Sequence, residues 1–122
     1  MTATTTAMML AAQGPWPTVT IDNLTAFAGG GQTAPCMRGQ VHRFVRVLST
    51  GDSACLPSLA QRDESARMIW VVNDSSNSMN VFAFVGDTMN GSLNGSLAVA
   101  AGAVGMFLKV DATLDWRGHV LT

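Results

Sequence analysis

Hydrophobic and polar residues alternate along much of this chain with the period of two that is typical of β-strands. The clearest case is the stretch 40–48. Alternation divides its residues into two faces, one with Val41, Arg43, Val45 and Val47, the other with His42, Phe44, Arg46 and Leu48. Both faces mix apolar and basic side chains. We therefore expect a strand that is partly covered on each side, as at a subunit boundary.

Other apolar runs of strand length are separated by short polar turns. These runs are 18–22, 68–72, 79–85, 97–101, 104–110 and 116–121. The runs 68–72 and 79–85 flank a polar loop, so we expect them to form a hairpin. No segment has the convincing 3.6-residue period of an amphipathic helix. The chain is therefore predicted to be all-β, a β-sandwich or jelly roll, or a short barrel, of seven or eight strands.

The first 17 residues do not follow the strand pattern, and Gly14, Pro15 and Pro17 break any regular element there. We expect residues 1–17 to form an extended N-terminal arm and residues 18–122 to form a single β domain, since 122 residues suit one domain. The chain shows neither the pattern of a secretion signal nor an apolar run of the ~20 residues that a membrane span needs.

Charge is scarce in this sequence. Charged residues make up 12% of the chain, whereas a typical soluble domain has about 25%. This composition favours a subunit that hides part of its surface against protein partners; a compact domain covered with Ser, Thr and Asn is the alternative. The net charge of −1 argues against nucleic acid or a membrane surface as a partner. The candidate interface residues are Met8, Met9, Leu10, Trp16, Arg43 and Arg46.

No recognisable catalytic or metal-binding motif is present. The acidic residues lie almost entirely in predicted turns, and no His-x-x-x-His, Cys-x-x-Cys or Gly-x-Ser-x-Gly spacing occurs. We therefore expect no enzymatic activity, cofactor, metal or small-molecule substrate. Cys36 and Cys55 are the only cysteines. They could form one disulfide, but the lack of a secretion signal favours two reduced, buried and unreactive thiols.

The last half of the chain resembles small bacteriophage structural proteins. The resemblance is carried, in order, by Cys55-Leu-Pro-Ser, Ile69-Trp-Val-Val-Asn-Asp, Met79-Asn-Val-Phe, Gly86-Asp-Thr-Met-Asn-Gly, Val99-Ala-Ala-Gly, Phe107 and Trp116. The Gly-Asp-Thr-x-Asn-Gly turn is its most specific part. Met89 stands where isoleucine is usual, and the proline often found near Phe84 is absent; both positions remain apolar. The resemblance does not extend to the first 50 residues.

The resemblance implies a virion protein, and within that class a capsid cement or decoration subunit. Such subunits resemble trimers that bridge and stabilise copies of the major capsid protein. The implied partners are thus the major capsid protein and further copies of this chain, as a homotrimer. The implied location is the capsid surface, after assembly in the host cytoplasm. Two alternatives stay open: a tail, baseplate or fibre-associated virion protein, and a host-attachment carbohydrate-binding module that uses Trp16, Trp70 and Trp116.

Overall fold

The computed structural model of the protein describes residues 20–37, 39–59, 68–109 and 114–121. These residues form ten β-strands and no helix. The strands are β1 (Thr20–Thr25), β2 (Val41–Arg46), β3 (Ser53–Cys55), β4 (Met68–Asn73), β5 (Met79–Phe82), β6 (Thr88–Met89), β7 (Ser92–Leu93), β8 (Ser96–Val99), β9 (Val104–Lys109) and β10 (Asp115–Leu121). The all-β prediction is confirmed. The arm predicted for residues 1–17 lies outside the described residues.

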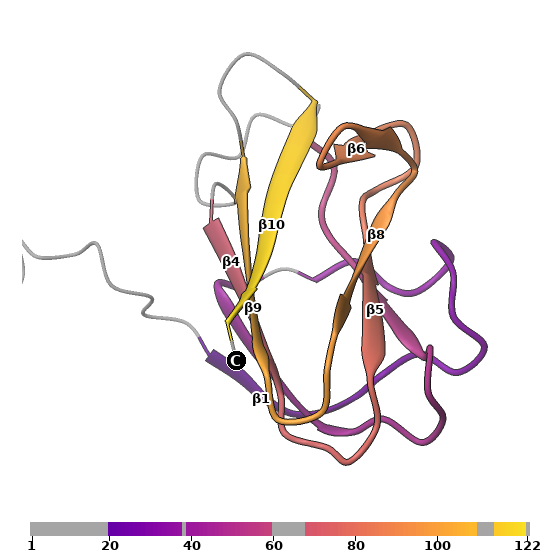
Figure 1. Ribbon diagram of the computed structural model, residues 1–122, viewed down its shortest axis with the longest axis vertical. Coiled ribbons are helices and arrows are strands. Elements are labelled where there is room, and N and C mark those ends of the chain that lie inside the picture. The colour runs from indigo at the N-terminus through magenta and orange to yellow at the C-terminus, as the bar shows by residue number, and fades with distance from the viewer. Residues whose placement is uncertain (1–19, 38, 60–67, 110–113, 122) are drawn as a thin grey trace, which may run out of the picture.

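Two sheets pack face to face as a sandwich (Figure 1). The larger sheet has seven strands in the order β1-β2-β4-β9-β10-β6-β7, and the smaller has the order β3-β5-β8. Both sheets are mixed, since β1, β2 and β4 run parallel while β9 is antiparallel to β4 and to β10. The described strands outnumber the expected seven or eight. The difference comes from β3, β6 and β7, each of two or three residues and too short to show alternation.

The predicted hairpin of 68–72 with 79–85 is wrong. These runs form β4 and β5, which belong to different sheets. Both edges of β4 are already occupied, because β2 pairs with one and β9 with the other. The polar loop between the runs therefore carries the chain from one sheet to the other.

The side chain of Asn73 holds this loop where it crosses between the two sheets. Its side chain is fully buried, and its Nδ2 donates to the carbonyl oxygens of Val99 at 2.9 Å and Asn77 at 2.8 Å. Its Oδ1 accepts from the backbone N–H and the hydroxyl of Ser75. One amide thus supplies hydrogen-bond partners both to the loop and to β8, and its own buried polar atoms are satisfied in return.

The core lies between the sheets. Alternation places Ile69, Val71, Phe107 and Trp116 on the inner face of the larger sheet, and all four side chains are at most 1% exposed. They pack in one cluster with apolar side chains of the smaller sheet, namely Met79, Val81 and Val99. Each large apolar side chain buried in this way contributes about 1.5–3 kcal/mol to folding.

Strand β2 confirms the alternation predicted for 40–48 only as far as Arg46. His42 and Phe44 are buried, while Arg43 is half-buried on the opposite face. Beyond the strand the pattern reverses, because Val47 is 3% exposed and Leu48 is 71% exposed. The extended strand ends at Arg46, so the period of two no longer decides which side chain points inward.

The predicted turn 86–91 contains the short strand β6, and a cluster of hydrogen bonds holds it beside β10. The carboxylate of Asp115 accepts from the hydroxyl of Thr88, from the backbone N–H of Gly91 at 3.0 Å and from Nε of Arg117 at 2.8 Å. Burial acts to raise the pKa of Asp115, but these three partners together hold it below its usual value.

Two other polar residues of this turn have structural partners. Asn90 mimics a strand residue, since its Oδ1 accepts from the N–H of Gly118 at 3.0 Å and its Nδ2 donates to the carbonyl of Gly118 at 3.2 Å. Asp87 is 3% exposed and accepts from the N–H of Leu59 at 2.8 Å. Burial raises the pKa of Asp87, and the Leu59 hydrogen bond opposes that rise.

Candidate functional site

On strands β2, β4, β9 and β10 of the larger sheet, the face that points away from the smaller sheet is largely apolar, and Arg43, Arg117 and His119 lie on it as well. We use the name outer face for these nine side chains: Val41, Val45, Met68, Trp70, Val72, Val104, Met106, Leu108 and Leu121. They come from four adjacent strands. Three of them are clearly exposed, with 39% for Met68, 40% for Leu108 and 44% for Leu121. The other six are half-buried.

Register places these side chains in continuous rows across the sheet. Val41, Trp70 and Met106 occupy paired positions on β2, β4 and β9. A neighbouring row joins Val72, Val104 and Leu121 on β4, β9 and β10. Side chains at paired positions contact one another on the sheet surface. The two rows therefore form an apolar patch bounded by Arg43 on β2 and by His119 on β10, and apolar patches on a protein surface commonly mark interaction sites.

Arg43 lies beside this patch but its charge is compensated within the chain. Its Nε donates to Asp74 at 2.7 Å, and its Nη1 donates to Asp22 at 2.9 Å. Hydrogen bonds to Asp22 and Asp74 raise the pKa of Arg43, and the Arg43 guanidinium lowers the pKa of Asp22. These side chains are 43–58% exposed, so the pairs add little stability. Their effect is to join β1, β2 and the end of β4.

Arg46 also contacts β1. It donates to Oδ1 and to the backbone carbonyl of Asn23, at 3.1 and 2.9 Å, and to the hydroxyl of Thr25 at 2.7 Å. Asn23 has a φ of 62° and lies where the register between β1 and β2 shifts. A bulge of this kind leaves backbone polar groups unpaired. Arg46 supplies one of the missing partners.

The predicted interface residues thus divide into two groups. Arg43 and Arg46 lie on β2, next to the edge strand β1, and both donate hydrogen bonds to β1. Met8, Met9, Leu10 and Trp16 lie outside the described residues. Sequence reasoning missed the outer face as a whole. The uninterrupted apolar run 68–72 could have indicated this face. In a strand with one solvated face, apolar and polar residues alternate, so an unbroken apolar run indicates a strand covered on both faces.

The tryptophans proposed as sugar platforms differ in accessibility. Trp116 is fully buried between the sheets, so its ring offers no stacking face to a ligand. Trp70 is half-buried within the outer face. Trp16 lies outside the described residues.

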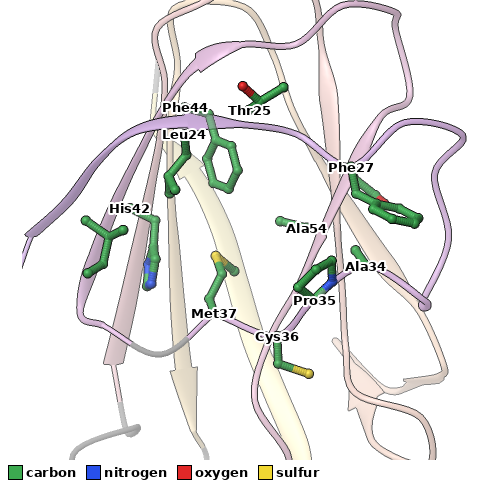
Figure 2. A pocket seen from close by; sticks show the side chains of 12 residues that line it. Leu24, Thr25, Phe27, Ala34, Pro35, Cys36, Met37, His42, Phe44 and Ala54 are labelled. Atoms are coloured by element: carbon green, nitrogen blue, oxygen red, sulfur yellow. The ribbon is translucent and has the colours of Figure 1, made fainter.

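An apolar pocket of about 430 Å³ lies between β1, β2, β3 and the segment 34–37 (Figure 2). Figure 2 shows the ring of Phe44 and the side chain of Met37 pointing toward each other across it. Leu24, Phe27 and Ala54 contribute further apolar surface. A pocket of this size and lining suits an apolar group.

His42 is the one imidazole in the lining of this pocket and is 2% exposed. Its Nε2 accepts a hydrogen bond from the N–H of Gly39 at 3.0 Å, so its proton resides on Nδ1. Nδ1 has no hydrogen-bond partner of good geometry among the described residues. Burial lowers the pKa of His42, and the nearby carbonyl of Trp70 opposes this only in part. The imidazole is therefore neutral at pH 7.

The two cysteines meet at the edge of the pocket. Cys36 is exposed and Cys55 is buried, so the expectation of two buried thiols was wrong for Cys36. Both are free thiols, and their Sγ atoms are 3.7 Å apart. Burial and the neighbouring Cys36 raise the pKa of Cys55 to about 12. Sequence could not reveal this proximity, because 19 positions and a sheet strand separate the two residues.

Within the described ranges, no group of three or more His, Cys, Asp and Glu side chains is placed to hold a metal ion. The same residues include no helix that could span a bilayer. Comparisons of the chain with known protein families, with curated proteins and with solved structures found no match.

Proposed function

We propose that this protein is a structural subunit of a bacteriophage particle, a capsid cement or decoration protein that bridges and stabilises major capsid proteins. The observation that carries the proposal is the outer face, an apolar surface spanning four strands of the larger sheet. The resemblance of residues 55–122 to small phage structural proteins supplies the biological setting.

A surface of this kind suits binding to protein. Interface cores are depleted in charge and enriched in aromatic residues and methionine. The outer face holds Trp70 and Met106 near its centre and Met68 in the row at its end. Charged residues stand at its margins, with Arg43 on one side and Arg117 on the other. This arrangement of apolar centre and polar rim favours a protein partner.

The low charge of the whole chain supports the same proposal. A shell protein is held at many equivalent positions, so modest contacts at each copy add up across the particle. We propose the major capsid protein and further copies of this chain as the partners, with a homotrimer as the repeating unit. Measurement of the solution mass tests the trimer, which has three times the 12.8 kDa of one chain.

The test is reconstitution on particles that lack the protein. Purified chain is added, and the bound copies per particle are counted by quantitative mass spectrometry and located by electron microscopy. Leu108→Glu and Leu121→Glu, both on the outer face, should lower occupancy at least about tenfold, because each places a charge in an apolar interface. Val85→Glu and Leu93→Glu are matched controls, since these residues are 61% and 67% exposed and lie outside the outer face.

Each result decides the proposal. A copy number comparable to that of the major capsid protein, lost with the outer-face variants alone, supports a cement subunit. A few copies located at the tail replace the capsid assignment with the tail-associated alternative. Failure to bind any part of the particle, or equal loss with outer-face and control variants, contradicts the proposal.

A further inference from the structure

The free thiols of Cys36 and Cys55 lie next to each other on neighbouring segments of the chain. They occupy paired positions of a parallel β-bridge, and the N–H of Met37 donates to the carbonyl of Cys55 at 2.8 Å. Neighbouring strands lie about 4.7–4.9 Å apart in the hydrogen-bonding direction. This range falls within the separation of about 4.4–6.8 Å that a disulfide spans. The backbone therefore already has the geometry of a cross-linked pair.

We propose that Cys36 and Cys55 form an intramolecular disulfide when the protein meets an oxidant, and that this bond locks the segment 34–37 onto β3. The Sγ atoms need only close from 3.7 Å to about 2.05 Å. Side-chain rotation supplies a movement of this size without separating the strands. The inference is independent of the proposed function.

The two thiols have different roles in the reaction. Cys36 is exposed at the pocket (Figure 2), so an oxidant in solution reaches it first. Cys55 is 1% exposed, and its thiol faces the carbonyl of Leu56 at 3.3 Å. Burial, Cys36 and the carboxylate of Asp87 raise the pKa of Cys55 to about 12. Cys55 therefore stays protonated and acts as the second, resolving thiol.

With hydrogen peroxide as the oxidant, the thiolate of Cys36 attacks one peroxide oxygen and the O–O bond breaks. The departing hydroxide takes up the proton that the Cys36 thiol released on ionising, so the products are a sulfenic acid on Cys36 and one water. The sulfur of Cys55 then loses its proton and attacks the sulfur of Cys36. The S–O bond breaks, and its oxygen leaves as a second water. In sum, two thiols and one hydrogen peroxide give one disulfide and two waters.

The bond would change the mobility of one wall of the pocket. Ala34, Pro35 and Met37 form part of the lining, and backbone hydrogen bonds hold this segment to β3 through Met37. A disulfide adds a covalent link at the same place and closes a loop between positions 19 apart. Closing such a loop lowers the entropy of the unfolded chain. Oxidation should therefore raise the melting temperature, by roughly 5–15 °C.

The experiment treats the reduced full chain with hydrogen peroxide and compares intact mass, tryptic peptides and melting temperature before and after. Trypsin cleaves after Arg38, Arg46 and Arg62. The disulfide therefore appears as residues 1–38 linked to residues 47–62, in a monomer lighter by two hydrogens. Dithiothreitol should separate the peptides and restore the lower melting temperature.

Single substitutions identify the role of each thiol. In Cys55→Ser the sulfenic acid on Cys36 has no resolving partner and should be trapped by dimedone. In Cys36→Ser the buried Cys55 should stay reduced at the same peroxide concentration. The proposal is overturned if Cys36 of the unaltered protein proceeds to sulfinic acid while Cys55 remains a thiol, or if the cysteines link only different chains. An unchanged melting temperature in the cross-linked monomer overturns the locking role.

Discussion

The ring of Phe107 lies directly over the backbone of Gly118, its paired residue on β10. A methyl group at position 118 would come within 3.0 Å of ring atoms Cδ1 and Cε1 of Phe107, and within 2.9 Å of Leu97 on the smaller sheet. Gly105 forms a similar contact, since a Cβ there would be 2.9 Å from the Phe107 ring and 3.0 Å from Val99. The two sheets approach closely at Phe107 because both neighbouring positions lack a side chain.

Substitution of Gly118 tests this packing. Gly118→Ala should lower the free energy of unfolding by about 1–3 kcal/mol, because the added methyl group overpacks a rigid site. Urea denaturation measures the loss. Phe107→Leu in the same chain should recover part of it, so a double-mutant cycle should give a clear coupling energy. Strict additivity of the two changes would contradict the contact.

Asn73 provides a second test of how the sheets are joined. Asn73→Leu removes the hydrogen bonds to the carbonyls of Val99 and Asn77 and leaves these groups without that donor. We expect a loss of about 1–3 kcal/mol in the free energy of unfolding, measured by urea denaturation. Ser76→Ala, at an exposed position of the same loop, is the control and should change stability little. Equal effects of the two substitutions would show that the buried amide has no special role.

His42 predicts a dependence of stability on pH. Its folded pKa is lowered by burial, so below its unfolded value of about 6.5 the unfolded chain binds a proton that the folded chain does not. The contribution of neutral His42 is complete above that pH and is lost as the pH falls toward the folded pKa. Thermal melts between pH 7.5 and pH 5 should show a decline that His42→Leu reduces. His119→Leu, at an exposed position, is the control and should leave the decline intact.

Deletion of residues 1–17 tests the arm. We expect the β domain to remain folded, since the core cluster formed by the described residues runs from Ala26 to Trp116, while attachment to the particle weakens. Circular dichroism checks the fold, and occupancy on depleted particles checks attachment. Unchanged affinity of the truncated chain would show that the arm takes no part in binding.

Local pattern predicted strands at 40–48, 68–72, 104–110 and 116–121, and the structure has β2, β4, β9 and β10 at these places, because period-two alternation and apolar runs reflect which side chains a strand buries. The loops were equally visible, and the glycines at 29, 30, 31 and 102 all have positive φ. Scarcity of charge led us to expect a surface that contacts protein partners, and this stays a prediction.

The local pattern of apolar and polar residues did not predict which strands pair with each other. The run 68–72 was expected to pair with 79–85, yet it lies between β2 and β9 in the other sheet. Alternation specifies which face of a strand is apolar, but not which edge of another strand it joins. The short strands were missed for the same reason. Their segments have too few residues to show alternation and are held by hydrogen bonds to distant groups such as Asp115 and Gly118.

The sequence by itself determined that this chain is all-β, poor in charge and without a recognisable catalytic or metal-binding motif. Tertiary structure alone decided that nine apolar side chains from four strands form one outer face, and that Cys36 and Cys55 stand 3.7 Å apart. The physical reason is common to both. Each depends on strand order and register, which arise from contacts between residues far apart in the chain.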